Sequence, residues 1–416
     1  MNLQREINNK LAIHLPILNV MRTTLFIFLF STMLFNRCDD VIETEKKITD
    51  AIRFVKQQNA PDGRVAIFSI SHQLDGRKIE LSGETDSKKA HEQFLDILKD
   101  LNREIVDKIR ILPDTAVGNE HYAIARNSVI NIRSKPKHSA ELGTQGLLGM
   151  PLKVLDKKGD FYRVQTPDKY ISWVDKGGIT RMEKSEFDEW QSSPKVIFTQ
   201  VFGYVYKDPS KNEIISDVTL GGLLQLNGYS DDFYKVEYPD GRQGFLSKND
   251  GVEFQKWLQT TSASAENIEQ IAKTMDGFPY LWGGTSSKGI DCSGFTKMVY
   301  LMNGFIIPRD ASQQVTAGKV IDENLDFSDL QKGDLLFFGK KAAETKKQRV
   351  THVGIWLGNE KMEFIHASGN VHISSMDENQ SNYDSFNKNR YLGSRRYLNV
   401  EDKLIVPLKS TINIKP

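Results

Sequence analysis

One cysteine and two histidines near the C-terminal end of the chain could together carry out nucleophilic catalysis. Cys292 stands in a glycine-rich turn before an expected helix, and the only other cysteine, Cys38, lies in an apolar leader. Backbone N–H groups at a helix start favour a thiolate, so Cys292 is the candidate nucleophile. His352 could take the thiol proton and return it to the leaving amine, and His366 could orient the ring of His352.

Each of these side chains also has a structural interpretation. Buried cysteines are common and mostly inert, and a single histidine in a strand is more often structural than catalytic. Zinc would require three or four close ligands, and no CxxC or HExxH pattern occurs, so we expect no metal and no cofactor. A cysteine and two histidines that follow one another on a helix start and two adjacent strands favour catalysis.

The elements that must position these side chains are predicted from the spacing of apolar residues. Behind Cys292, apolar residues recur at helical spacing: Phe295, Met298, Val299 and Met302. Apolar runs predict strands over 335–338, 351–358 and 362–367, and the last two carry the histidines. The charged segment 340–349 predicts a solvated hairpin loop. Pairing of the last two strands would bring the histidines together.

An internal repeat lies upstream of this region. Residues 160–168, DFYRVQTPD, match residues 232–240, DFYKVEYPD, at a separation of 72 positions. Short strand-like runs with Asp-Gly, Gly-Asp and Pro-Asp turns surround both copies, which predicts two small β-barrels over 122–182 and 195–253.

A smaller unit precedes the barrels, over residues 41–115. Strands are predicted at 64–70, at 78–82 and from Val106 to Leu112, with an amphipathic helix over 87–101. This α+β unit contains no cluster of residues that suggests chemistry, and we assign it no function.

The bulk composition excludes some classes of protein. The chain has 416 residues, which is too many for one core, and 55 basic residues against 54 acidic ones. A dedicated nucleic-acid-binding protein would usually carry a basic excess, so no nucleic-acid partner is expected.

The N-terminal segment, residues 1–38, reads as a leader. An 11-residue apolar run over 25–35 follows Arg22, and it is shorter than the roughly 18 apolar residues that a membrane span needs. This pattern predicts export. Cys38 follows the run and resembles the cysteine that is acylated in bacterial lipoproteins, so a lipid anchor at Cys38 is one interpretation and an incidental cysteine is the other.

Three short motifs resemble those of the NlpC-type cell-wall cysteine peptidases. They are DCSGF at 291–295, THVGI at 351–355 and FIHAS at 364–368, in the order and at the spacing of that family. The resemblance covers the predicted domain at 261–398 and implies a papain-like α+β fold with a Cys-His-His triad. The fold class we expect is therefore multidomain: this catalytic domain, two SH3-like β-barrels before it, and a small α+β N-terminal domain.

The full architecture resembles one branch of this family, the SH3-domain-containing γ-D-glutamyl-L-diamino-acid endopeptidases of dipeptidyl-peptidase VI type. That resemblance implies that Asp291 and Ser293 bind the free amine of an N-terminal L-Ala, and that Tyr280 hydrogen-bonds near the substrate and assists the oxyanion. A carboxylate is the natural partner of an ammonium group. Tyr280 could instead be a core aromatic residue. Further substrate contacts are implied for Ser312, Glu141 and Tyr170.

The function that follows is hydrolysis of the γ-D-Glu–diamino acid bond in murein peptides with a free N-terminal L-Ala. A broader peptidoglycan hydrolase that acts on intact sacculi, and a non-catalytic wall-binding protein, are the alternatives. The expected partners are peptidoglycan-derived peptides, and the expected form is an exported monomer, either periplasmic or anchored to the membrane.

Overall fold

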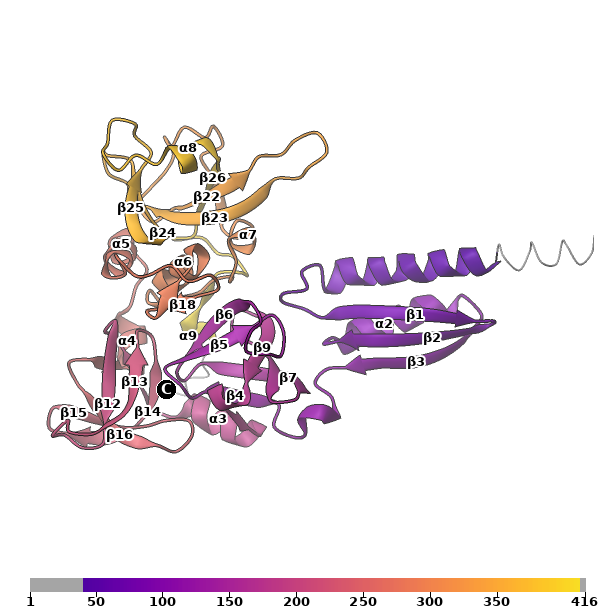
Figure 1. Cartoon of the computed structure of the whole chain (residues 1–416), viewed down its shortest axis with the longest axis horizontal. Helices are drawn as coiled ribbons and strands as arrows, with labels where there is room; N and C mark the ends of the chain where they lie inside the picture. Colours follow the sequence, from indigo (N-terminus) through magenta and orange to yellow (C-terminus); the bar gives the residue numbers. More distant parts are fainter. Residues whose placement is uncertain (1–39, 412–416) are drawn as a thin grey trace, which may run out of the picture. The chain divides into compact units, whose positions relative to one another are not determined.

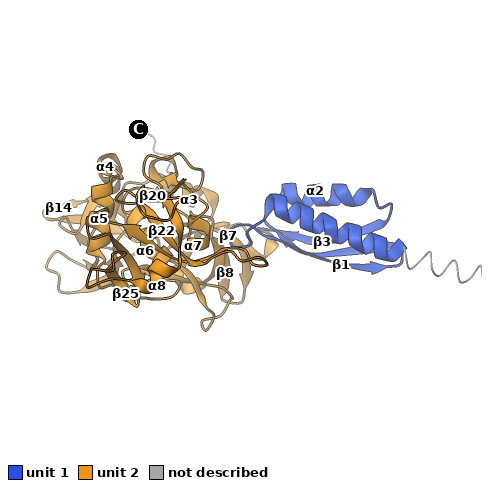
Figure 2. Ribbon diagram, turned by 90° about the horizontal axis from the view of Figure 1, so that it is seen from above, with its two compact units in different colours: residues 1–112 blue, residues 113–416 orange. Residues whose placement is uncertain are grey.

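The computed structural model describes residues 40–411. They belong to two compact units, which divide the chain between residues 112 and 113 (Figure 2). The predicted leader and Cys38 lie outside the described residues. Among the helices of the described part, none is long and apolar enough to cross a membrane.

The first unit is a three-stranded sheet with two helices on one face (Figure 2). A helix over residues 40–59 precedes β1 (Phe68–Asp75), β2 (Lys78–Thr85), α2 (Lys88–Lys99) and β3 (Glu104–Ile111). Strands β1 and β2 form an antiparallel hairpin, and α2 carries the chain over to β3, which runs parallel to β2. The core between the helices and the sheet includes Ile48, Val55, Ile79, Leu81 and Phe94.

Two features of this unit differ from the sequence prediction. The strand predicted at 64–70 is wrong at its start, because Asp62 accepts hydrogen bonds from the backbone and side chain of Arg64 and turns the chain there. The helix over 40–59 was not predicted, although Ile48 and Val55 stand one helical repeat of seven residues apart.

The second unit begins with two seven-stranded sheets. We call residues 122–182 the first β module and residues 195–253 the second β module. The first has the strand order β10-β4-β7-β8-β9-β5-β6. Its strands are β4 (Tyr122–Ala125), β5 (Val129–Arg133), β6 (Leu142–Leu147), β7 (Pro151–Lys158), β8 (Phe161–Gln165), β9 (Ile171–Asp175) and β10 (Ile179–Met182). Short 3-10 helices lie at Thr115–Val117 and Lys176–Gly178.

The second β module has the order β13-β12-β16-β15-β14-β11-β17. Its strands are β11 (Lys195–Phe198), β12 (Phe202–Tyr206), β13 (Ile214–Thr219), β14 (Leu223–Ser230), β15 (Phe233–Glu237), β16 (Gln243–Ser247) and β17 (Gly251–Glu253). The sequence repeat has a structural counterpart. Each copy is the second strand of a hairpin, and the hairpin is bulged at Val154/Asp156 in the first module and at Leu226/Gly228 in the second. Helix α3 (Lys184–Ser192) joins the modules, and α4 (Phe254–Thr260) follows them.

The remaining part of the second unit is built on a six-stranded antiparallel sheet of order β21-β26-β22-β23-β24-β25 (Figure 1). Its strands are β21 (Lys319–Ile321), β22 (Leu335–Lys340), β23 (Arg349–Trp356), β24 (Glu363–Ser368), β25 (Asn370–Ser375) and β26 (Tyr391–Arg396). Its helices are α5 (Ala265–Thr274), α6 (Cys292–Leu301), α7 (Ala311–Gln314), α8 (Ser385–Asn389) and α9 (Leu408–Thr411). Two small ribbons pair β18 (Thr285–Ser286) with β19 (Gly289–Ile290), and β20 (Phe305–Ile306) with β27 (Val406–Pro407).

Helix α6 is the central element of this part, because every residue from Cys292 to Tyr300 is buried. Its apolar side packs in one core with residues of β22, β23 and β24, including Phe337, Val353 and Ile365. The helix start is therefore held against the middle of the sheet, where the strands carry the two histidines.

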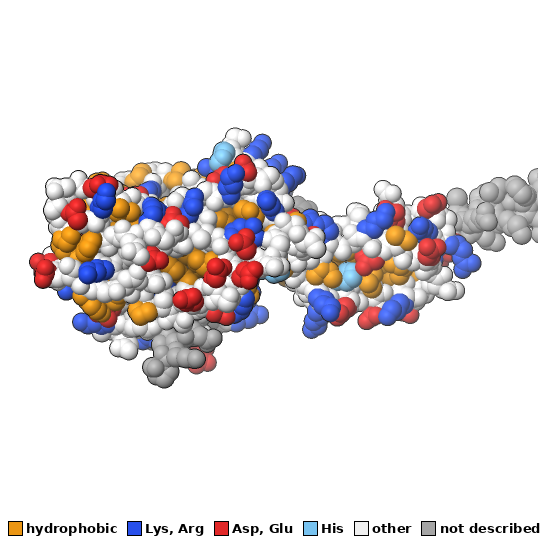
Figure 3. All heavy atoms as spheres, turned by 90° about the horizontal axis from the view of Figure 1, so that it is seen from below, with side chains coloured by type: hydrophobic (Ala, Val, Ile, Leu, Met, Phe, Trp, Pro, Cys, Tyr) orange, Lys and Arg blue, Asp and Glu red, His pale blue; other side chains and the backbone are white. Residues whose placement is uncertain are grey.

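Charged side chains are mixed over the surface. Figure 3 shows acidic and basic groups interspersed on the displayed face of each unit, which agrees with the net charge of +1.

Candidate active site

The start of α6 places Cys292 at the end of a tightly packed turn. Asp291 caps the helix by accepting a hydrogen bond of 2.7 Å from the Gly294 backbone N–H. A side chain at Gly294 would meet the Gly284 carbonyl oxygen at 2.0 Å, so only glycine fits there. Cys292 itself is 7% exposed, and no disulfide involves it.

Burial of Cys292 opposes the thiolate that its helix-start position favours. Burial raises the pKa of the Cys292 thiol to about 12, and the negative charge of Asp291 adds to the rise. Backbone N–H groups of Val353 and Ser293 and the charge of Arg309 act in the opposite direction but do not outweigh burial. The proton must therefore be removed by a base during the reaction.

The two predicted histidines form a buried pair on adjacent strands. His352 Nε2 on β23 lies 2.7 Å from His366 Nδ1 on β24. Cys292 receives a hydrogen bond from the backbone of Val353, the residue after His352, so the thiol lies beside this strand. Burial is the main cause that holds the pKa of His352 well below its usual value and lowers that of His366 to about 3. Both rings are therefore neutral near pH 7.

The surroundings of His366 determine which nitrogen of His352 can act as a base. His366 Nε2 lies 3.1 Å from Ser374 Oγ and 3.9 Å from Asp384 Oδ2. A nearby carboxylate favours a proton on that nitrogen, so we infer that His366 Nδ1 accepts a hydrogen bond from His352 Nε2. The other nitrogen of His352, Nδ1, is then unprotonated and available to a thiol proton.

A buried arginine holds the turn before Cys292. Arg309, which is 1% exposed, makes a bidentate pair with Asp291, with Nη2–Oδ2 at 2.7 Å and Nη1–Oδ1 at 3.1 Å. Its Nη1 also donates to Ser293 Oγ at 2.9 Å. The Asp291 carboxylate accepts further bonds from Gly283 N, Gly294 N and Ser293 Oγ. These donors fill the roughly four lone-pair sites of a carboxylate.

Comparison with known proteins identifies the family of this chain. Residues 277–390 match the model of the NlpC/P60 family. A protein from Bacillus cereus named gamma-D-glutamyl-L-lysine dipeptidyl-peptidase is 30% identical over 330 residues, which are 76% of this chain and 94% of that protein. The chain belongs to the NlpC/P60 family. It is therefore a cysteine peptidase.

Other known proteins are similar over large parts of the chain. Dipeptidyl-peptidase 6 from Lysinibacillus sphaericus is 30% identical over 278 residues, 63% of this chain and 94% of that protein. A crystal structure of an NlpC/P60 family protein from Bacillus cereus superimposes with a TM-score of 0.57 at 28% identity, covering 67% of this chain and 99% of that one. Residues 132–179, in the first β module, match the model of the bacterial dipeptidyl-peptidase SH3 domain.

The first β module contacts the turn before the NlpC/P60 cysteine at several points. Glu141 Oε1 accepts a hydrogen bond of 2.7 Å from Trp282 Nε1. Thr144 Oγ1 accepts one of 3.0 Å from Arg309 Nε, and Gln145 bonds through its side chain and backbone to Thr285. These contacts join the SH3-like module to the active-site turn by polar groups that are mostly buried.

The other predicted site residues lie around the same turn. Tyr280 pairs with Ile290 in an isolated backbone β-bridge. Burial raises the pKa of its phenol, and negative charge on Cys292 and Asp291 raises it further. Tyr170 belongs to the first β module, and its hydroxyl lies close to Gly143. It contributes electrostatically to the raised pKa of Arg309. Ser312 is exposed on the short helix α7. The structure thus brings Tyr280, Asp291 and Ser293 to the cysteine, with Glu141 and Tyr170 near the turn.

Several residues that shape the site were missed from the sequence. They are Thr144, Gln145, Trp282, Arg309, Ser374, Asp384 and Arg390. Gln314 was also missed, and its amide binds the Ser293 and Pro308 carbonyl groups. The sequence analysis did consider the segment 308–312 that contains Arg309, because Ser312 was predicted from it. The sequence of that segment does not show which carboxylate Arg309 binds.

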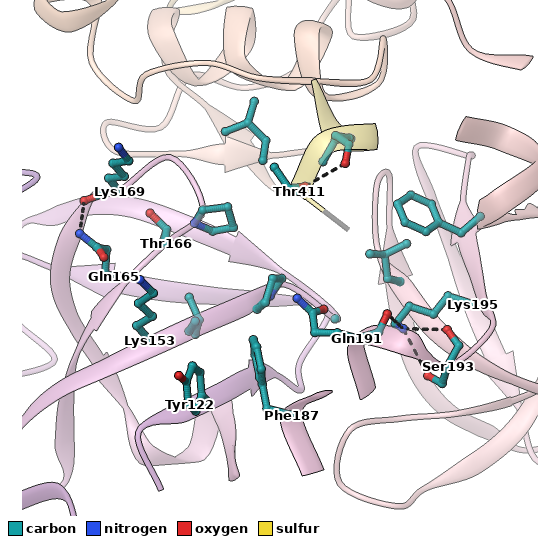
Figure 4. A pocket seen from close by; sticks show the side chains of 18 of the residues that line it. Tyr122, Lys153, Gln165, Thr166, Lys169, Phe187, Gln191, Ser193, Lys195 and Thr411 are labelled. Atoms are coloured by element: carbon teal, nitrogen blue, oxygen red, sulfur yellow. Dashed lines mark hydrogen bonds between the residues drawn. The ribbon is translucent and has the colours of Figure 1, made fainter. Parts of the chain in front are cut away.

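A separate cavity of about 500 Å³ lies away from the histidines (Figure 4). Strands of the first β module line it together with α3, α4 and the last helix, and Tyr122, Phe187 and Lys195 face it. None of the predicted site residues lines this cavity, so we assign it no part in the reaction.

Proposed function

We propose that this protein is a cysteine endopeptidase that hydrolyses the γ-D-Glu–diamino acid bond of murein peptides with a free N-terminal L-Ala. Support comes from two relatives, matched over 330 and 227 residues, whose names specify a γ-D-glutamyl-L-lysine dipeptidyl-peptidase. The observation that supports the proposal most is the packing of the first β module on the turn that ends in Cys292, where Glu141 bonds to Trp282 and Thr144 to Arg309. The catalytic domain is proposed to have the papain-like arrangement.

The proposed reaction proceeds through a thioester. Cys292 Sγ attacks the γ-carbonyl carbon of D-Glu while its proton moves to His352 Nδ1. The resulting oxyanion is stabilised by the Cys292 backbone N–H and the Tyr280 hydroxyl. Collapse breaks the C–N bond, and His352 returns the proton to the leaving amine of the diamino acid. Water, deprotonated by His352, then hydrolyses the thioester and releases L-Ala-γ-D-Glu and the thiol.

Recognition of the substrate amine is proposed to use two carboxylates. The Asp291 charge is offset by Arg309, and its oxygens are occupied by internal donors, so Asp291 and Ser293 would form one wall of the amine site. Glu141 uses one oxygen for Trp282, and its other oxygen has no protein donor among residues 40–411. A free ammonium group could therefore bind Glu141 directly, with Tyr170 and Ser312 as further contacts.

The leader predicted at residues 1–38 fits this function, because wall peptides lie outside the cytoplasm. We propose that the protein is exported, and an acyl group on Cys38 would hold it at the membrane.

The test is a defined set of peptides followed by mass spectrometry. Purified protein is given L-Ala-γ-D-Glu-L-Lys and L-Ala-γ-D-Glu-diaminopimelate, each with a free and an acetylated N-terminus. Release of L-Ala-γ-D-Glu from the free peptides alone is expected. Cys292→Ala and His352→Ala should abolish turnover, and His138→Ala, which changes an exposed histidine, should not.

Two outcomes would contradict the proposal. Unchanged turnover by Cys292→Ala would exclude the mechanism. Equal rates on free and acetylated peptides, with release of fragments from intact sacculi, would show a broader peptidoglycan hydrolase instead.

A further inference from the structure

Arg390 reaches from the end of α8 to the strand that carries His352. Its Nε donates to Asn387 Oδ1 at 2.9 Å, and its Nη1 donates to Thr351 Oγ1 at 3.1 Å. Thr351 directly precedes His352 on β23. Two hydrogen bonds therefore fix the guanidinium plane beside the histidine pair.

The outer side of this guanidinium has no hydrogen-bond acceptor among the described residues. Within residues 40–411, Nη2 of Arg390 makes no hydrogen bond, and no carboxylate lies within 4.0 Å of the group. Arg309, the other arginine of the site, differs because its three nitrogens are all bonded. Arg390 is only partly buried, and its guanidinium carbon lies 4.4 Å from the ring centre of Phe386, which is 69% exposed. The open donors are thus reachable from solvent beside an aromatic ring.

The charge of Arg390 acts on the reacting groups, which shows how near it is to them. It contributes to the low pKa of His352 and of His366. Burial lowers the pKa of Arg390, and Asp384 and the Cys292 thiolate oppose that change. A cation with free donors therefore lies near the thiol and the base, where the scissile amide must bind.

We propose that Arg390 binds a carboxylate of the substrate next to the scissile bond. This inference rests on the proposed function. A γ-linked D-Glu keeps its α-carboxylate free, and the diamino acid on the other side of the bond carries a carboxylate too. A guanidinium pairs with such a group through two parallel N–H···O bonds, and Nη2 with the second hydrogen of Nη1 supplies those donors. Phe386 would then flank the aliphatic part of the bound residue.

The test compares three peptides with the wild-type protein and Arg390→Gln. The peptides are L-Ala-γ-D-Glu-L-Lys, its analogue with the D-Glu α-carboxylate amidated, and its analogue with the C-terminal carboxylate amidated. Amidation of the bound carboxylate should lower the wild-type kcat/KM by about 10- to 100-fold, which is the usual effect of losing a charged hydrogen-bonded pair. Arg390→Gln should lower kcat/KM for the unmodified peptide by a similar factor. In this variant, amidation of the bound carboxylate should cause no further loss of kcat/KM.

Control variants separate recognition from other effects. Arg349→Gln makes the same change at an exposed position of β23 and should leave the peptide preference unchanged. Arg390→Lys should keep part of the preference for the free carboxylate, since the charge remains. Thermal unfolding of each variant reports whether the fold is intact.

The results assign the carboxylate or overturn the proposal. The amidation that ceases to matter in Arg390→Gln identifies which carboxylate is bound. If both amidations act equally in the wild type and in Arg390→Gln, or if the variant only shifts the pH profile through the histidines, Arg390 does not bind substrate. Absence of turnover of all three peptides by the wild type would instead refute the proposed function, and the inference with it.

Discussion

Removal of Arg309 should destabilise the second unit strongly. Arg309→Met deletes four hydrogen bonds, two to Asp291, one to Ser293 and one to Thr144. It leaves the Asp291 carboxylate buried with backbone donors but without a counter-charge. Breaking a buried ion pair in this way costs about 3–5 kcal/mol of unfolding free energy.

The assay is equilibrium unfolding in urea followed by tryptophan fluorescence. All five tryptophans lie in the second unit, so the signal reports that unit alone: Trp173, Trp190, Trp257, Trp282 and Trp356. Asp291→Asn and the double variant complete a thermodynamic cycle. The double variant should cost at least about 2 kcal/mol less than the sum of the single variants, since neither charge is then left alone.

The matched control is Lys207→Met, which breaks an exposed ion pair with Glu213 in the second β module. That change should cost no more than about 1 kcal/mol. A loss of the same small size for Arg309→Met, with strictly additive effects in the cycle, would refute the buried-pair argument.

Four further predictions concern the histidines and the contact with the first β module. Because burial lowers the pKa of His352, kcat/KM should fall only as pH drops well below 6.5, and an acid limb at 6.5 or above in the pH–rate profile would contradict this. The unfolded chain binds more protons than the folded one below pH 6.5, so urea unfolding free energy should decline there as pH falls, by up to about 1.4 kcal/mol per pH unit for each buried histidine. Ser374→Ala should lower kcat about 10-fold with little change in KM, since it loosens the base without touching substrate, and an effect on KM alone would argue otherwise. Lys297→Met leaves Asp168 of the first β module buried and unpaired, and should cost about 3–5 kcal/mol in the same unfolding assay, whereas a loss below 1 kcal/mol would show that the pair is not desolvated.

The elements around the reacting groups could be predicted from local patterns. Helical spacing after Cys292 predicted α6, and apolar runs predicted the strands of His352 and His366. These signals are local because apolar periodicity follows from the geometry of one element. The helix-start argument considered only the backbone groups near Cys292, and it could not include the burial that the tertiary fold imposes and that raises the pKa of the thiol.

Partners from distant parts of the chain could not be predicted. Arg309 binds Asp291, 18 residues away in the sequence, and Thr144, 165 residues away. Asp384, at the start of α8, lies 3.9 Å from His366 of β24. Side chains of this kind are ordinary charged residues in the sequence. Only the fold shows which charge they neutralise and which donor they leave open.

Buried contacts join the first β module to α6, the helix that begins at Cys292. Lys297 on α6 pairs with Asp168 at 2.6 Å, and both side chains are buried. Arg309 joins Thr144 of the module to Asp291, the residue that caps the helix of the nucleophile. Charges buried in pairs are costly to separate, so the module cannot leave α6 without exposing or orphaning them. The module therefore stays beside the active-site turn, and under the proposed function we expect selectivity for peptide ends to depend on module residues such as Glu141.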